Sequence, residues 1–171
     1  LLSLTAWFAS GARQRSAASP AKAWVLLAAG IAAIIFTGVS GSMAALTNML
    51  FPSATLSEGL AKDFAPDSHI LLRLRIFHPI ISIFTAMFLI MISAYVKKLV
   101  NREGPGARWA GALSGLVIAQ IAFGAATLLM LAPIVMQLGH LLLADVVWIA
   151  FVLMWASVVW GGKRGGAAEL P

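Results

Sequence analysis

Four long apolar stretches, each nearly free of charge, dominate this sequence of 171 residues. They run from about 24–51, 78–96, 109–131 and 138–160. A membrane-spanning helix needs about 20 apolar residues to cross a hydrocarbon core about 30 Å thick. Only 11% of the residues are charged, against about 25% in soluble domains, so a water-exposed surface could not be covered. The sequence predicts an all-α integral membrane protein, an antiparallel four-helix transmembrane bundle.

A shorter apolar run at 1–10 precedes these stretches. Ten helical residues cover only about 15 Å, and neither a basic region nor an initiator Met precedes the run, as a signal peptide would require. We therefore expect it to be the tail of a preceding transmembrane helix that is truncated here. The remaining expected regions are a cytoplasmic loop at 11–23, the bundle at 24–162 and a cytoplasmic tail at 163–171.

The positive charges lie mostly on one predicted side of the membrane. Nine of the twelve Lys and Arg residues fall there: Arg13, Arg15, Lys22, Lys97, Lys98, Arg102, Arg108, Lys163 and Arg164. The positive-inside rule makes this side cytoplasmic. The net charge of +6 thus reflects membrane orientation. We expect no nucleic-acid partner, because these loops lack interleaved aromatic residues.

Two of the three histidines lie at the starts of predicted spans on the outer side, His78 in the second and His140 in the fourth. Alternate helices of an antiparallel four-helix bundle can lie diagonally across its core. Facing imidazoles from such helices can hold a haem iron from both sides. A histidine at a helix end is more often an interfacial hydrogen-bonding residue, so the pattern alone leaves both interpretations open.

Small residues recur in the first and third spans, where a flat macrocycle would need room. They are Gly30, Gly38, Gly41 and Ala45 in the first span, and Gly111, Gly115, Ala119, Ala122 and Ala126 in the third. Close packing of membrane helices uses the same residue types. These stripes are therefore compatible with a cofactor without requiring one.

Arg73 and Arg75 precede His78 on the outer side. Arginine is a favoured partner of carboxylates such as haem propionates, so both are predicted to bind the cofactor. Interfacial anchoring is the alternative. His69, in the same polar loop, is expected to be solvated.

Asp145 and Gln120 are polar residues inside predicted spans. Asp145 lies five residues after His140, about 140° further round the helix. We expect it to be buried and to bond a neighbouring helix, with Gln120 or a Ser or Thr as partner; proton handling is the alternative. Gln120 is expected to form a hydrogen bond between helices.

Three segments resemble the haem A synthase family, and the resemblance covers all four spans. The segments are GSMAALTNMLFP at 41–52, LRLRIFHP at 72–79 and QLGHLLLADVVWIA at 137–150, the most specific. In the first segment, Thr47 and Asn48 stand where the family commonly has Gly and Asp.

The resemblance implies an oxidoreductase of two homologous four-helix bundles in the bacterial cytoplasmic membrane. The N-terminal bundle, absent from this sequence, would hold haem O, whose C8 methyl is oxidised to the formyl group of haem A for cytochrome oxidase. This chain resembles the C-terminal bundle, which holds a haem b near the outer face and relays electrons. His78 and His140 would then be the axial ligands of a bis-histidine haem b, and Asp145 would be structural. The catalytic residues would lie outside this chain.

The partners implied are membrane lipid, haem O in the missing bundle, and an electron donor or another respiratory or haem-biosynthesis protein. Two other functions stay open. One is a non-catalytic membrane cytochrome b subunit that only transfers electrons, and the other is a haem-free structural or transport subunit. Without cysteine, disulfides, thiolate metal sites and iron–sulfur clusters are excluded.

Overall fold

A computed structural model of the chain describes residues 5, 21–100 and 103–160. Within these ranges the regular structure is entirely helical, and no strand is present. The elements are α2 (Ala21–Leu50), α3 (Leu56–Phe64), α4 (Ile70–Arg75), α5 (Phe77–Leu99), α6 (Pro105–Leu129) and α7 (Ile134–Trp160). Apart from the helical Thr5, the run predicted at 1–10 lies outside the described residues, as do most of the first loop and the tail.

Among the described residues, four helical stretches are long and apolar enough to cross a membrane, which confirms the predicted fold class. They are Ala21–Leu50, Ile70–Leu99, Pro105–Leu129 and Ile134–Val159. The second stretch begins eight residues before the predicted span, because Arg73 and Arg75 lower the hydropathy of α4. The segment 52–77, which the sequence suggested was a loop, contains both α3 and α4.

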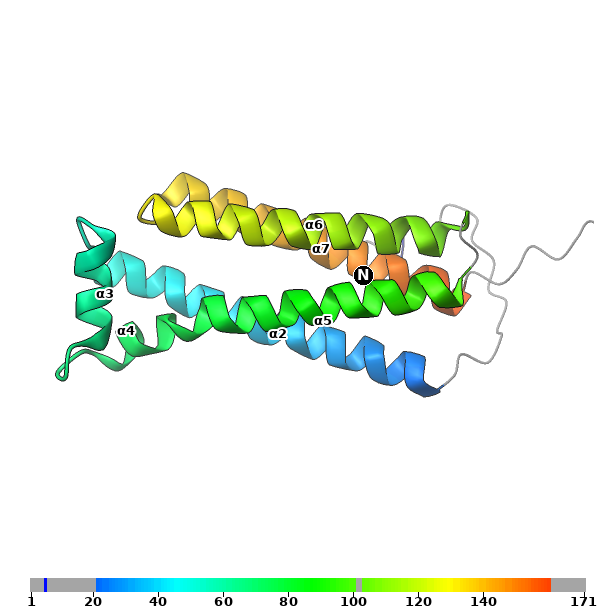
Figure 1. Cartoon of the computed structure of the whole chain (residues 1–171), viewed down its shortest axis with the longest axis horizontal. Helices are drawn as coiled ribbons and strands as arrows, with labels where there is room; N and C mark the ends of the chain where they lie inside the picture. The colour runs from blue at the N-terminus through cyan, green and yellow to red at the C-terminus, as the bar shows by residue number, and fades with distance from the viewer. Residues whose placement is uncertain (1–4, 6–20, 101–102, 161–171) are drawn as a thin grey trace, which may run out of the picture.

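The long helices run antiparallel, and each packs mainly on its neighbours in the chain (Figure 1). The principal contacts join α2 to α5, α5 to α6, and α6 to α7, while α2 and α7 touch over a shorter length. Helices α5 and α7 share no extensive contact. They therefore occupy opposite corners of the bundle, and these are the helices that carry His78 and His140.

The buried apolar core fills only one half of the bundle. It consists of Ala23, Leu89, Ile92, Val96, Ala110, Leu113, Val117, Val147, Ala150, Phe151, Met154 and Trp155. All of these lie where α2 and α6 begin and where α5 and α7 end. We call this the basic end, because its described part also carries Lys22, Lys97, Lys98 and Arg108. The opposite end, which α3 and α4 cover in Figure 1, is called the α3–α4 end.

A glycine allows α2 to approach α7 at the basic end. A Cβ atom built on Gly30 would lie 2.4 Å from Cζ of Phe151, a fully buried core residue. Because a side chain there would displace this ring, the glycine at position 30 determines how closely α2 can approach α7. Gly38, two turns further along α2, has nothing within 4 Å of its Cβ position.

We predict that Gly30→Ala lowers stability relative to Gly38→Ala by about 1–3 kcal/mol, the usual cost of overpacking a core. Both variants gain the same helix propensity, so Gly38→Ala is a matched control. Thermal unfolding in detergent, followed by circular dichroism, measures the difference. Equal melting temperatures for the two variants would show that a side chain at position 30 does not disturb the packing of Phe151.

Candidate functional site

His78, the second residue of α5, packs its ring against α2. A Cβ atom at Gly41 would lie 3.0 Å from Cε1 of His78, so the ring occupies the space that glycine leaves. Nδ1 of His78 is 2.9 Å from Oγ of Ser40, and Oγ of Ser82 lies 3.5 Å from both ring nitrogens. The half-buried imidazole is thus held between α2 and its own helix.

His140, in the second turn of α7, packs its ring against α6 in the same manner. A Cβ atom at Gly124 would lie 2.9 Å from Cε1 of His140. The ring stacks on Phe123 with an interplanar angle of 4°. Nε2 of Gln120 lies 3.3 Å from Nε2 of His140 and 3.1 Å from the carbonyl oxygen of His140. The predicted role of Gln120 in bonding between helices is therefore confirmed.

The two histidines share an arrangement that suits the binding of a flat group. Each half-buried ring lies over a glycine of a neighbouring helix, from diagonal corners of the bundle, and beyond the apolar core. Nδ1 of His140 and Oε1 of Gln120 are buried without a hydrogen-bond partner, which costs about 1–3 kcal/mol for each atom. The α3–α4 end thus concentrates polar groups that the bundle itself leaves unsatisfied.

Protein groups alone do not complete a metal site in the described part of the chain. No group of three or more His, Cys, Asp or Glu side chains there could hold an ion. Two imidazoles fit an iron whose other ligands come from a macrocycle, because a porphyrin supplies four nitrogens of its own. The donors present therefore match a bis-histidine haem.

Arg75 forms a buried connection among three helices of the α3–α4 end. Its Nη2 atom lies 2.7 Å from Oδ1 of Asp63, and its Nη1 donates to Oδ1 of Asn48 over 2.8 Å. Nη2 also donates to the carbonyl of Gly59. The sequence did not reveal this network, because its residues are far apart along the chain. It fixes α4, and hence the start of α5, against α2 and α3.

Arg73 is exposed and makes local contacts. It donates to the carbonyl of Pro66 over 2.7 Å and to Oγ of Ser68 over 3.0 Å. These bonds stabilise the turn between α3 and α4. Contact of Arg73 or Arg75 with a propionate stays a prediction.

His69 is exposed, as predicted, and has a local role that the sequence did not suggest. It is the N-cap of α4, with its Nδ1 accepting the backbone N–H of Leu71 over 3.2 Å. On α3, Glu58 pairs with Lys62 at 2.7 Å. The hydrogen bond from Lys62 holds the pKa of the Glu58 carboxyl below its usual value.

The prediction that Asp145 is buried is wrong. It is exposed on α7 and makes no hydrogen bond or ion pair with another described residue. The expected partner, Gln120, contacts His140 instead. The rotation of about 140° from His140 is the physical reason, because it carries Asp145 away from the face that meets α6.

The small residues of the third span make little contact within the bundle. Gly115, Ala119 and Ala122 are exposed, and a Cβ on Gly115 would meet nothing within 4 Å. The α6 glycines that lie close to other side chains are Gly124, beside His140, and Gly106, beside Ser157, and both lie outside the predicted stripe. In the first span, the space at Gly41 is filled by the ring of His78, so room for a macrocycle beside these small residues stays a prediction.

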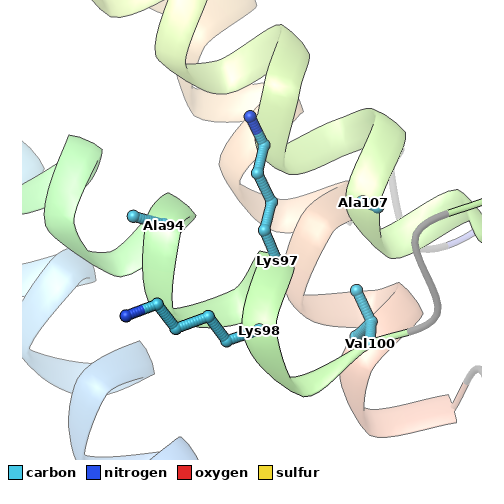
Figure 2. Close-up of a pocket in the computed structure, with 5 residues that line it drawn as sticks. All are labelled: Ala94, Lys97, Lys98, Val100 and Ala107. Carbon is cyan, nitrogen blue, oxygen red and sulfur yellow. The ribbon is translucent and has the colours of Figure 1, made fainter.

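A pocket of about 750 Å³ lies at the basic end, lined by Ala94, Lys97, Lys98, Val100 and Ala107 (Figure 2). The two lysine side chains extend in different directions, toward α6 and toward α2. The residues that line this pocket do not include either histidine. It is therefore separate from the site at the α3–α4 end.

We predict that Arg75→Ala lowers the free energy of unfolding by about 3–5 kcal/mol, because it leaves the Asp63 carboxylate buried without its partner. Arg73→Ala, on the same short helix, removes only exposed contacts and should cost less than about 1 kcal/mol. Denaturation in detergent compares the two. Equal losses would mean that the Arg75–Asp63 pair does not hold this end together.

Comparison with known proteins identifies relatives of this chain. Two proteins from two strains of Thermus thermophilus are 35% and 34% identical to the chain over 164 residues, and both are named protoheme IX farnesyltransferase. The alignments cover 95% of this chain but 27% of each relative, so the chain spans about a quarter of their length. No solved structure matches the chain.

The family of cytochrome oxidase assembly proteins called COX15-CtaA matches residues 1–152, a range that includes both histidines and their contacts. This match confirms the resemblance to the haem A synthase family that the three sequence segments indicated. Because it covers most of the chain, the protein belongs to the COX15-CtaA family of cytochrome oxidase assembly proteins.

Proposed function

We propose that this chain is the haem b-binding part of a haem A synthase, the enzyme that oxidises the C8 methyl of haem O to the formyl group of haem A. The family supports this, since its members assist the assembly of cytochrome oxidase. The Thermus relatives are named for transferring a farnesyl group to protoheme IX, which also supports chemistry on haem. The oxidation of haem O itself would take place outside this chain, with electrons relayed through it.

The observation that carries the proposal is the matched placement of the two imidazoles. His78 lies over Gly41 and His140 over Gly124, on helices at opposite corners and at the same end of the bundle. These two residues would hold the haem iron. A low-spin iron with two imidazole ligands changes redox state with little rearrangement, which suits electron relay.

The chain's other residues would orient these ligands and tune the potential. Ser40 contacts Nδ1 of His78, and a hydrogen bond at the nitrogen that does not bind metal fixes the orientation of a metal-binding histidine. The apolar helices exclude water, and burial is one of the terms that sets a haem potential. Arg73 and Arg75 remain the proposed partners of the propionates.

We propose that the protein lies in a bacterial cytoplasmic membrane with its haem site near the outer face. The basic end carries Lys22, Lys97, Lys98 and Arg108. At the other end the three cations Lys62, Arg73 and Arg75 are balanced by Glu58, Asp63 and Asp67. By the positive-inside rule, the basic end is cytoplasmic.

We predict that His78→Ala and His140→Ala each remove the low-spin b-type spectrum of the haem-loaded chain, because each deletes an axial ligand. His69→Ala is the matched control and should keep the spectrum, since His69 caps α4 and its ring lies against Phe51. Optical spectra of the reduced proteins measure this. Retention of the wild-type spectrum in both of the first two variants would refute the assignment of the ligands.

A non-catalytic cytochrome b subunit would give the same spectra. The two functions separate when His78→Ala and His140→Ala are placed in the full protein that contains this chain, and haems are extracted and separated by chromatography. The synthase proposal predicts loss of haem A with haem O remaining. Normal haem A in both variants would favour the non-catalytic subunit.

A further inference from the structure

The hydroxyl groups around His78 determine which of its ring nitrogens carries hydrogen. Oγ of Ser40 lies 2.8 Å from the carbonyl oxygen of Thr37 and 2.9 Å from Nδ1 of His78. A hydroxyl has one hydrogen, and a carbonyl can only accept. Ser40 therefore donates to Thr37 and accepts the N–H of Nδ1. This leaves the lone pair of a neutral His78 on Nε2.

Ser82 does not compete for that lone pair. Its hydroxyl donates to the backbone carbonyl of His78 over 2.8 Å, so it has no hydrogen to offer Nε2, which is 3.5 Å away. Nε2 is the nitrogen that a metal would use when Nδ1 donates to a neighbour. In the neutral form of His78, Nε2 therefore has a free lone pair with which it can bind iron.

The environment of His140 differs in this respect. The NH2 group of Gln120 must face the carbonyl oxygen of His140, 3.1 Å away, because the amide oxygen would be repelled there. The same nitrogen lies 3.3 Å from Nε2 of His140 and has a second hydrogen to donate to it. The lone pair of Nε2 is therefore occupied, and the Nδ1–H of His140 is buried without a partner.

We infer that Gln120 would compete with a bound haem iron for Nε2 of His140, so that His140 would be displaced more readily than His78. This inference rests on the proposed function. If a small external base such as cyanide displaced His140, the imidazole would be free to accept the hydrogen bond from Gln120 again. The hydrogen bond from Gln120 thus favours replacement of His140, and not of His78, by an external ligand.

Cyanide titration of the ferric, haem-loaded chain tests this competition. Gln120→Leu removes the bond that the released imidazole regains, so cyanide should bind roughly fivefold more weakly than to wild type, the effect of one hydrogen bond. Ser114→Ala is the control on the same helix, because its hydroxyl bonds only the carbonyl of Ala110. Unchanged cyanide affinity in Gln120→Leu, or loss of its low-spin spectrum, would overturn the inference.

A measurement without haem separates this inference from the proposed function. In 15N spectra of the histidine-labelled apo chain at pH 8, we expect His78 and His140 to carry hydrogen on Nδ1. His69 should carry it on Nε2, because its Nδ1 accepts from Leu71. Gln120→Leu should shift only His140, and Ser40→Ala only His78.

The outcomes are distinct. Resonances of His140 that do not move in Gln120→Leu would contradict the hydrogen bond itself, whether or not haem binds. The expected shifts in a chain that never takes up haem would instead refute the proposed function, and the competition for iron with it.

Discussion

The packing of large side chains at the basic end holds the four helices together, and the rest of the structure depends on it. Phe151 and Trp155 of α7 are almost completely buried there, and Phe151 fills the space left by Gly30. Membrane helices gain little from burial of apolar surface, because lipid is as apolar as a side chain, so close packing provides the attraction. With this contact confined to one end, the other end is free to hold polar rings between helices.

The α3–α4 end is stabilised differently, through charges and caps rather than an apolar core. Arg75, Asp63 and Asn48 connect three helices, and the connection lies three residues before His78. The network thus fixes the position of the start of α5, and with it the position of His78. The second imidazole depends on the contact of α7 with α6, through Gln120 and Phe123. The two ligands are therefore positioned by separate parts of the fold.

Hydropathy predicted the four spans, and chain direction predicted that His78 and His140 lie at one end. These features could be predicted because backbone N–H and C=O groups in lipid must be hydrogen-bonded within the protein, so a long apolar segment crosses the membrane as a helix. The sequence did not predict which face of each helix points into the bundle. In α7, for example, apolar residues lie on all sides, so only side-chain packing sets the rotation of the helix about its axis. Asp145 was therefore placed on the wrong face, and the pairing of Gln120 with His140 was not predicted. Helices α3 and α4 were not predicted, because they are short and carry the charged residues that are typical of a loop.

The most direct test of the central claim is the pyridine haemochrome and electron paramagnetic resonance spectrum of the purified, unmodified chain. A bis-histidine haem b between α5 and α7 predicts protohaem at one equivalent per chain and a ferric low-spin signal typical of two imidazole ligands. A protein that stays colourless after reconstitution with haem, or that binds it only in a high-spin form, would contradict the account.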